Sequence, residues 1–333
     1  MTHRQTKPWL LWLLWTLAGA GLLFFVVLDE GTTMHPLTWL ALMLGMAPLI
    51  GAQLALGAPK AAAAVQTWLD DHPRAWLVAV GVLSGFYLLT GLLTLHFDPY
   101  ATAIFIVGLL AAFGTLREIQ HGRRGLTWAD IAVWLLLWIP FDLRWNYDLW
   151  FGPKGFAYNW WAVLLTVVAV IGWYGLRGLP DFGYRLTPRW KDLGIALVAT
   201  AVFAVIVIPL GLAIDFLSFP PSHTPTLLGI AAHFVGLFLT VALPEEIFFR
   251  GILLHGLDQM SNRRGWTLFL SSVAFGLMHW NNAAALGTKV AYVALATLAG
   301  AFYGWAYRKS ENNLLAAVLS HTFVDLLWSV LFS

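Results

Sequence analysis

The sequence predicts an all-α fold, a polytopic transmembrane helical bundle of about 10–11 spans. Hydrophobic residues make up 59% of the 333 residues, and charged residues make up only 11%, against about 25% in a typical soluble domain. The mean hydropathy is +0.73. Long apolar runs recur along the chain and lack the two-residue alternation of a membrane β-barrel, so the spans are expected to be helices.

The same composition excludes several classes of protein. Too few charges are present to solvate a soluble chain of this length, and disordered, coiled-coil, collagen-like and nucleic-acid-binding proteins are disfavoured. The chain has no cysteine, which excludes a disulfide framework, a thiol nucleophile and a cysteine-bound metal. The expected surroundings are therefore the lipid bilayer, and no nucleic-acid partner is expected.

Eleven segments approach the length of about 20 apolar residues that a helix needs to cross a membrane. In chain order they are residues 8–28, 37–57, 75–96, 101–115, 128–141, 157–175, 193–216, 226–257, 266–280, 289–306 and 313–332. The first run is too long for the apolar region of a signal peptide and is not followed by a clean cleavage site, so it is interpreted as a span. The short segments 101–115, 128–141 and 266–280 are expected to be tilted, re-entrant or buried in the bundle.

The distribution of Lys and Arg predicts a cytoplasmic N-terminus. If all eleven segments cross, three basic residues fall on the outer side: Arg144, Lys154 and Lys289. The other sixteen fall on the cytoplasmic side: Arg4, Lys7, Lys60, Arg74, Arg117, Arg123, Arg124, Arg177, Arg185, Arg189, Lys191, Arg250, Arg263, Arg264, Arg308 and Lys309. This is a strong positive-inside bias.

A basic connection at residues 176–192, with prolines at 180 and 188, divides the chain. Residues 1–175 are predicted to form an accessory bundle with almost no ionisable group at membrane depth. Its Asp130 lies near a predicted helix start, where an acid favours the helix dipole, although a functional buried acid is the alternative. Residues from about 190 to 333 are predicted to form the functional bundle.

The functional bundle carries ionisable residues inside its apolar segments, where each charge costs about 2.5–3.5 kcal/mol even on insertion scales. They are Glu245, Glu246 and Arg250 in the segment 226–257, His279 at the end of 266–280, and His321 and Asp325 in 313–332. At a rise of 1.5 Å per residue, the four residues Glu245, His279, His321 and Asp325 lie about 12–20 Å from the cytoplasmic ends of their segments. The three segments therefore place their polar groups near one level of the bilayer.

Spacing predicts how these side chains are arranged. Glu246 and Arg250 are four residues apart and can pair on one helix face, while Glu245 is rotated by about 100° from Glu246 and can face elsewhere. His321 and Asp325 also share one face, as two ligands of one metal often do.

These residue types suit metal-assisted hydrolysis. His279, His321 and Asp325 can bind zinc and leave one position open for water, and Glu245 can take the proton of that water. The helical HExxH pattern of many zinc hydrolases is missing, so the parts are spread over three helices.

The motifs resemble those of the CPBP family, the intramembrane CAAX-type prenyl endopeptidases and their bacteriocin-processing relatives. The three motifs are Glu245-Glu246-x-x-x-Arg250, Phe275-x-x-x-His279 and His321-x-x-x-Asp325. Matching neighbours are Phe249-Arg250-Gly251, Ser271-Ser272, Phe275-Gly276 and Gly300. The resemblance covers about residues 225–330, and residues 1–190 resemble no family.

The resemblance implies an intramembrane endopeptidase that cleaves a membrane-associated or C-terminal-tail peptide. Glu245 would activate water, and Glu246 and Arg250 would order the site. His279 would be a partner of the water or a metal ligand, and His321 and Asp325 would be metal ligands or transition-state stabilisers. Asp325 stands where eukaryotic-type members have Asn, which favours metal binding and weakens the expectation of a prenylated substrate. The breadth of the family in bacteria suggests a prokaryotic inner membrane.

Other interpretations remain open. Glu246 and Arg250 can form a structural ion pair, Glu245 can be a charge at a helix end, and Phe275 can serve packing alone. His279, His321 and Asp325 can be satisfied buried residues. A metal-independent glutamate mechanism is an alternative to zinc. A catalytically silent immunity or scaffold protein on the same fold, or a secondary transporter, is an alternative to a protease.

Overall fold

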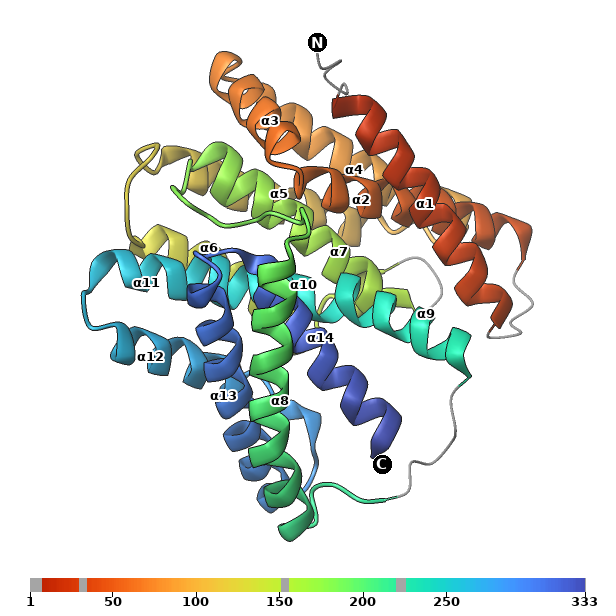
Figure 1. Cartoon of the computed structure of the whole chain (residues 1–333). Coiled ribbons are helices and arrows are strands. Elements are labelled where there is room, and N and C mark those ends of the chain that lie inside the picture. Colours follow the sequence, from red (N-terminus) through yellow and green to blue (C-terminus); the bar gives the residue numbers. More distant parts are fainter. Residues whose placement is uncertain (1–7, 30–34, 151–155, 220–225, 333) are drawn as a thin grey trace, which may run out of the picture. The chain divides into compact units, whose positions relative to one another are not determined.

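The computed structural model describes residues 8–29, 35–150, 156–219 and 226–332. Within these ranges every regular element is a helix (Figure 1), which confirms the predicted all-α fold. The chain forms two compact units, residues 1–123 with 127–180, and residues 124–126 with 181–333. The accessory and catalytic roles of the two halves of the sequence stay predictions.

The first unit contains seven α-helices. They are α1 (Pro8–Asp29), α2 (Pro36–Leu56), α3 (Pro59–Asp71), α4 (Ala75–Leu93), α5 (Pro99–Glu118), α6 (Trp128–Asp142) and α7 (Ala157–Ala169), with the short η1 (Tyr147–Leu149) and the π-helical η3 (Val170–Leu176). Proline opens α2, α3 and α5, because its fixed φ suits the first helical turn and its missing N–H has no partner there. The sequence did not predict α3.

Aromatic side chains fill the core of the first unit. The rings of Tyr87 on α4 and Phe105 on α5 stack at 4.2 Å, and Trp160 on α7 lies 5.8 Å from Tyr87. The indole N–H of Trp160 donates a hydrogen bond to the carbonyl of Gly45 on α2 at 3.2 Å. A buried indole needs such a partner, so this bond fixes α7 against α2.

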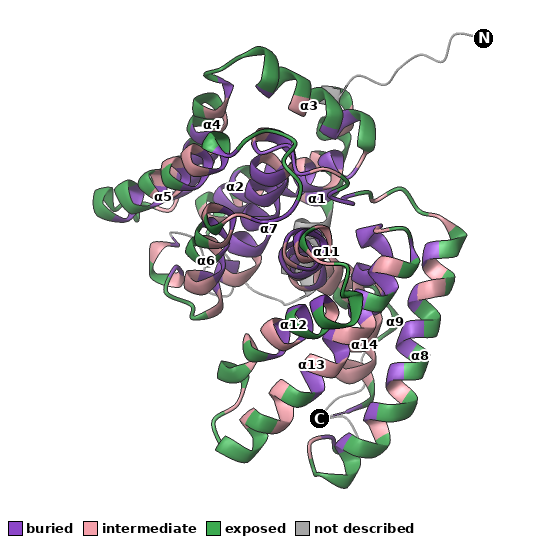
Figure 2. Cartoon of the chain, turned by 90° about the vertical axis from the view of Figure 1, so that its left-hand side faces the viewer, coloured by how far each residue is buried: buried purple, intermediate pink, exposed green. Residues whose placement is uncertain are grey.

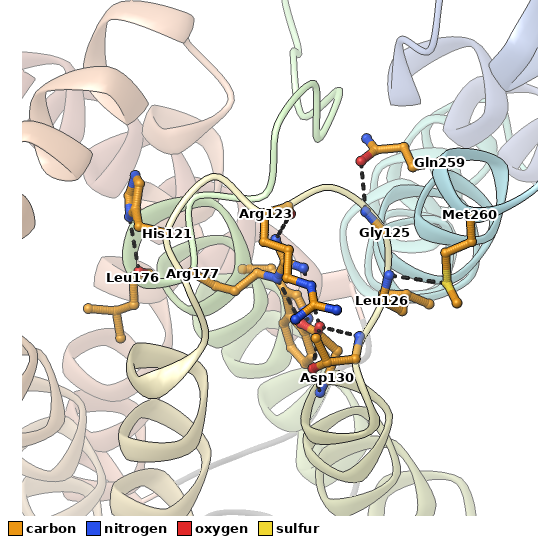
Figure 3. Close-up of polar contacts among 11 residues, drawn as sticks. His121, Arg123, Gly125, Leu126, Asp130, Leu176, Arg177, Gln259 and Met260 are labelled. Carbon is orange, nitrogen blue, oxygen red and sulfur yellow. Dashed lines mark hydrogen bonds and ion pairs between the residues drawn. The ribbon is translucent and has the colours of Figure 1, made fainter.

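Asp130 is both a helix cap and the partner of a buried cation (Figure 3). It forms a capping box with Thr127 at the start of α6. Its Oδ1 also accepts hydrogen bonds from Arg177 Nε at 2.9 Å and from Trp173 Nε1 at 3.0 Å. Arg177 also donates to the carbonyl of Arg123. The side chains of Asp130 and Arg177 are fully buried, so each charge needs the other.

The second unit contains the remaining helices. They are α8 (Trp190–Ala213), α9 (Leu227–Leu237), η4 (Phe238–Ala242), α10 (Leu243–Glu246), η5 (Ile247–Leu254), α11 (His255–Met260), α12 (Arg264–Leu277), η6 (Trp280–Asn282), α13 (Leu286–Lys309) and α14 (Leu314–Leu331). The short segment 124–126 belongs to this unit. There the amide of Gly125 donates to Gln259 Oε1 at 3.0 Å, and the amide of Leu126 donates to Met260 Sδ at 3.3 Å (Figure 3).

Elements α9 to α11 form one continuous helix, Leu227–Met260, whose winding changes along its length. η4 and η5 are π-helical and flank α10. Pro244 in α10 has no N–H to bond the carbonyl four residues earlier, and its ring crowds that carbonyl, which loosens the winding on its N-terminal side. Such π-helical turns are frequent at functional sites, and here they flank Glu245 and Glu246.

The start of α8 is anchored to the turn between α13 and α14. Arg189 donates to both carboxylate oxygens of Asp192 at 2.8 Å and to the carbonyl of Ser310 at 2.9 Å. The hydrogen bond with Asp192 raises the pKa of Arg189. The hydrogen bond from Lys191 lowers the pKa of the exposed Glu311 carboxyl.

Eight of the described helices are long and apolar enough to cross a membrane. Helix α5 has 20 residues, so the expectation that 101–115 is short is wrong, because the helix extends to Pro99 and Glu118. The 15-residue α6 and the 14-residue α12 fall below that length, as expected for 128–141 and 266–280. Along α1 the described apolar stretch is Leu10–Gly21.

The predicted orientation in the membrane stays a prediction. Three residues that enter the charge count, Arg4, Lys7 and Lys154, lie outside the described residues.

Candidate active site

Five of the six predicted site residues come together in the second unit. Glu245 and Glu246 lie on α10, Arg250 on η5, and His321 and Asp325 on α14. The helix carrying the first three packs against α14, so residues about 75 positions apart in the sequence meet.

Arg250 and Glu246 form the buried base of the cluster. Arg250 Nη1 donates to Glu246 Oε1 at 2.7 Å, and the two side chains are 1% and 0% exposed. This confirms the pairing predicted from their four-residue spacing. Arg250 Nη2 donates to the carbonyl of Gly300 at 3.0 Å, and the guanidinium lies 4.3 Å from the centre of the Phe275 ring. The cation is therefore held by a carboxylate, a carbonyl and an aromatic face.

The imidazole of His321 lies between three carboxylates. Its Nδ1 is 2.9 Å from Glu246 Oε1, and its Nε2 is 3.3 Å from Asp325 Oδ2 and 3.8 Å from Glu245 Oε2. The distance to Asp325 confirms that this pair shares one helix face. Glu245 and Glu246 do diverge as neighbours on a helix should, but they reach opposite nitrogens of the same ring.

Two aromatic rings fix the plane of His321. Tyr303 on α13 stacks on the imidazole with centroids 4.5 Å apart and planes at 16°. Phe275 on α12 meets it edge-on at 5.6 Å and 84°. Sequence reasoning missed Tyr303. The available signal was its position three residues after Gly300, which places both on one face of α13.

Phe275 serves both packing and the site. Its ring contacts Phe249 at 5.2 Å and His279 at 4.8 Å in addition to His321. The sequence left two interpretations of Phe275, packing support and lining of the site, and the contacts of its ring agree with both.

His279 borders the cluster and, among the described contacts, shares no hydrogen bond with it. Its Nδ1 bonds the carbonyl of Phe275 at 2.9 Å, and its ring stacks on Tyr292 at 5.4 Å. The described contacts include no hydrogen bond between His279 and Glu245, His321 or Asp325. It is linked to the cluster through the ring of Phe275 and by electrostatic interactions with His321 and Asp325.

Gly300, which precedes the third motif in the sequence, allows α13 to approach the cluster. A Cβ atom on Gly300 would lie 3.2 Å from Arg250 Nη2, from Phe275 Cδ1 and from the Cα of Ser272. These contacts are tighter than ordinary van der Waals distances. The glycine therefore allows its own carbonyl to reach Arg250.

Exposure rises in one direction through the cluster. The side chain of Glu246 is 0% exposed, that of His321 4%, that of Glu245 12% and that of Asp325 30%. The cluster therefore opens on the side of Asp325. Within the cluster, Oε2 of Glu245 and Oε2 of Glu246 are buried carboxylate oxygens without a hydrogen-bond partner in the structure, a condition that is uncommon for buried polar atoms.

The predicted zinc ligands His279, His321 and Asp325 do not form a metal-binding group in this geometry. Among the described residues, no set of three or more His, Asp or Glu side chains is arranged to hold a metal ion. Among the described contacts His279 has no hydrogen bond to His321 or Asp325, and His321 uses Nδ1 for Glu246. The donor set as placed does not fit a bound zinc ion, and the zinc site stays a prediction from the sequence.

A comparison with protein families identifies the segment that carries the cluster. Residues 227–327 match the family model described as Rce1-like, type II CAAX prenyl endopeptidase Rce1-like. The match spans all six predicted site residues and confirms the resemblance found in the motifs. No curated protein and no solved structure is significantly similar to the chain.

Proposed function

From the membership of residues 227–327 in the type II CAAX prenyl endopeptidase family, we propose that this multi-pass membrane protein is an intramembrane endopeptidase. In this proposal Glu245 activates a water molecule that hydrolyses a peptide bond. The substrate is a membrane-associated peptide or the C-terminal tail of a membrane-associated protein, because the site lies on helices long and apolar enough to cross a membrane.

The observation that carries the proposal is the state of Glu245. Its Oε2 is buried and accepts no hydrogen bond from the protein, while Nε2 of His321 lies 3.8 Å away. A carboxylate held without a donor is costly unless the reaction supplies one. A water molecule placed there would give its proton to Glu245 as it attacks the peptide carbonyl, and Glu245 would then pass the proton to the leaving amine.

The other residues take supporting roles. Glu246, which is itself paired with Arg250, accepts a hydrogen bond from Nδ1 of His321 and thereby directs Nε2 toward Glu245 and Asp325. Nε2 of His321 would face the oxygen that gains negative charge in the transition state. His279 would act as a partner of the water at the edge of the site, since it contacts Phe275 and Tyr292 and interacts electrostatically with Asp325.

The observed contacts favour an enzyme over a catalytically silent scaffold on the same fold. Glu245 takes no part in the ion pair between Glu246 and Arg250 and lies 3.8 Å from Nε2 of His321, so that ion pair does not account for a second buried acid. A structural ion pair between Glu246 and Arg250 would serve a scaffold equally well and does not discriminate.

The test is digestion of membrane-anchored peptides by the full chain in liposomes. Peptides with and without a prenylated C-terminal cysteine are incubated with the wild type, with Glu245→Gln and with Glu118→Gln. Glu118 lies at the exposed end of α5 and serves as the matched glutamate control. We expect cleavage by the wild type and Glu118→Gln, and none by Glu245→Gln. Equal cleavage by all three proteins would refute the proposed role of Glu245.

A further inference from the structure

An apolar groove runs between α8 and α13, outside the contacts of the candidate active site. Its volume is about 370 Å³, within the range of about 300–1,000 Å³ that is typical of sites for small ligands. It is lined by Val198, Ala199 and Val202 on α8 and by Ala301, Phe302 and Trp305 on α13. No lining side chain is charged, so the groove suits a hydrocarbon chain.

The shape of the groove follows from residue size. Ala199 and Ala301 contribute no more than a methyl group, so the two helices leave space between their larger neighbours. Phe302 and Trp305 stand on the α13 side, and Trp305 remains 39% exposed. Exposed residues follow the outer face of α8 along its length (Figure 2), as expected for a helix in contact with lipid.

Two lysines lie at the same end of this groove. Lys191 precedes Val198 by seven residues, which places it on the same face of α8, about 10 Å along the axis. Lys309 follows Trp305 by four residues on α13, about 6 Å along the axis. Both lysines are exposed. The two helix ends are held together, because Arg189 donates to the carbonyl of Ser310 and Lys191 bonds Glu311 at 2.5 Å.

The charge at this end is only partly neutralised. Arg308 is paired with Asp258 at 2.6 Å, and Lys191 is paired with Glu311. Lys309 has no carboxylate partner among the described contacts. The exposed Arg264 likewise has no carboxylate partner among the described contacts. Its backbone carbonyl accepts a hydrogen bond from Arg308, so Arg264 lies beside the end of α13.

We propose that this groove binds an anionic phospholipid. One acyl chain lies between α8 and α13, and the phosphate lies at the end marked by Lys191 and Lys309. The apolar groove has Lys309 and Arg264 at one end, and neither has a carboxylate partner among the described contacts. This combination fits an amphiphile with a negative headgroup, and basic pockets between spans are a recurrent way to bind such lipids. A zwitterionic lipid would gain less from Lys309. This lipid site is independent of the proposed protease activity.

The test is native mass spectrometry of the full chain titrated with phosphatidylglycerol or phosphatidylcholine of matched acyl chains. We expect one phosphatidylglycerol molecule to bind more tightly than phosphatidylcholine. Lys309→Gln should weaken that binding by about fivefold, the effect of one lysine near an anionic headgroup. Lys60→Gln, which removes an exposed lysine on α3, should leave the affinity unchanged.

The groove itself is tested by filling it. We expect Val202→Trp to abolish the tight phosphatidylglycerol peak. If that variant does not purify as a single species, Ala301→Leu takes its place with the same expected result. Leu197→Trp is the control, because Leu197 is 51% exposed on α8 and does not line the groove. Equal affinity for the two lipids, unchanged binding in the filled variants, or a dimer that only the filled variants lose would overturn the proposal.

Discussion

Nδ1 of His321 on α14 donates a hydrogen bond to Oε1 of Glu246 on α10 at 2.9 Å, and the same oxygen accepts from Arg250 at 2.7 Å. One buried carboxylate oxygen thus joins the first and the third motif. The bond fixes the orientation of the imidazole and leaves Nε2 directed at Asp325 and Glu245. Glu246 is therefore a positioning residue in the proposed mechanism, and Glu245 is the group that reacts.

Glu246→Gln tests this division of roles. The amide keeps the shape of the side chain but gives Arg250 and His321 a weaker acceptor, because the hydrogen bonds lose their charge. We expect kcat to fall by about 10- to 100-fold, as for other partners that orient a site residue, with little change in KM. Steady-state kinetics on a cleaved membrane peptide measure this. An unchanged kcat would show that the orientation of His321 does not depend on Glu246.

Tyr303 is predicted to matter through its ring. Tyr303→Phe keeps the stack on His321 and should retain activity, whereas Tyr303→Leu removes a ring contact of the kind worth about 0.5–1.5 kcal/mol and should reduce activity. The pair of variants is compared for cleavage rate and for thermal unfolding of the purified protein. Equal activity of the Phe and Leu variants would contradict a role for the stack.

Gly300→Ala tests the close approach of α13. The added Cβ would lie 3.2 Å from Arg250, Phe275 and Ser272, and overpacking of this kind typically costs about 1–3 kcal/mol of stability. We expect a lower melting temperature and slower cleavage. Gly287→Ala is the matched control on the same helix, because no atom lies within 4 Å of its Cβ position. Similar effects of the two substitutions would argue against a specific role for Gly300.

The zinc predicted from the sequence has a direct measurement. In this structure Nδ1 of His279 bonds the carbonyl of Phe275, and Nε2 of His321 lies 3.3 Å from Asp325, so zinc binding by these three residues needs its own test. If zinc is bound at this site, wild-type protein purified without chelators should contain nearly one zinc ion per chain. The His279→Ala/His321→Ala double variant should contain none. Elemental analysis of both folded proteins measures it. Wild-type protein without metal would contradict the zinc prediction and leave the role of Glu245 to be tested separately.

Helical periodicity accounts for what could be predicted of the site. Four-residue spacing anticipated the pair of Glu246 with Arg250 and the proximity of His321 to Asp325. Both relationships lie within one helix, where the rise and turn are fixed. The all-α fold could be predicted from composition and from the length of the apolar runs, because forming each helix does not depend on how the helices pack.

Relationships between helices could not be predicted in this way. The stack of Tyr303 on His321 and the carbonyl contact of Gly300 with Arg250 depend on how α13 packs, which spacing does not encode. The buried pair of Asp130 with Arg177 was missed because Arg177 stood in a basic connection and was counted among the cytoplasmic charges. Helix α3 was missed because its 13 residues are too short and too polar to resemble a span.

In the proposed mechanism, Glu245 activates the water that cleaves the peptide bond. The most direct measurement is single-turnover cleavage of a membrane-anchored peptide in water enriched in oxygen-18, with wild type, Glu245→Gln and the Glu118→Gln control in parallel. We expect one heavy oxygen in the new carboxyl terminus and an unchanged rate for Glu118→Gln. The rate of Glu245→Gln should be at least about 100-fold lower, which is the usual contribution of a general base. A Glu245→Gln protein that cleaves at the wild-type rate would contradict this mechanism.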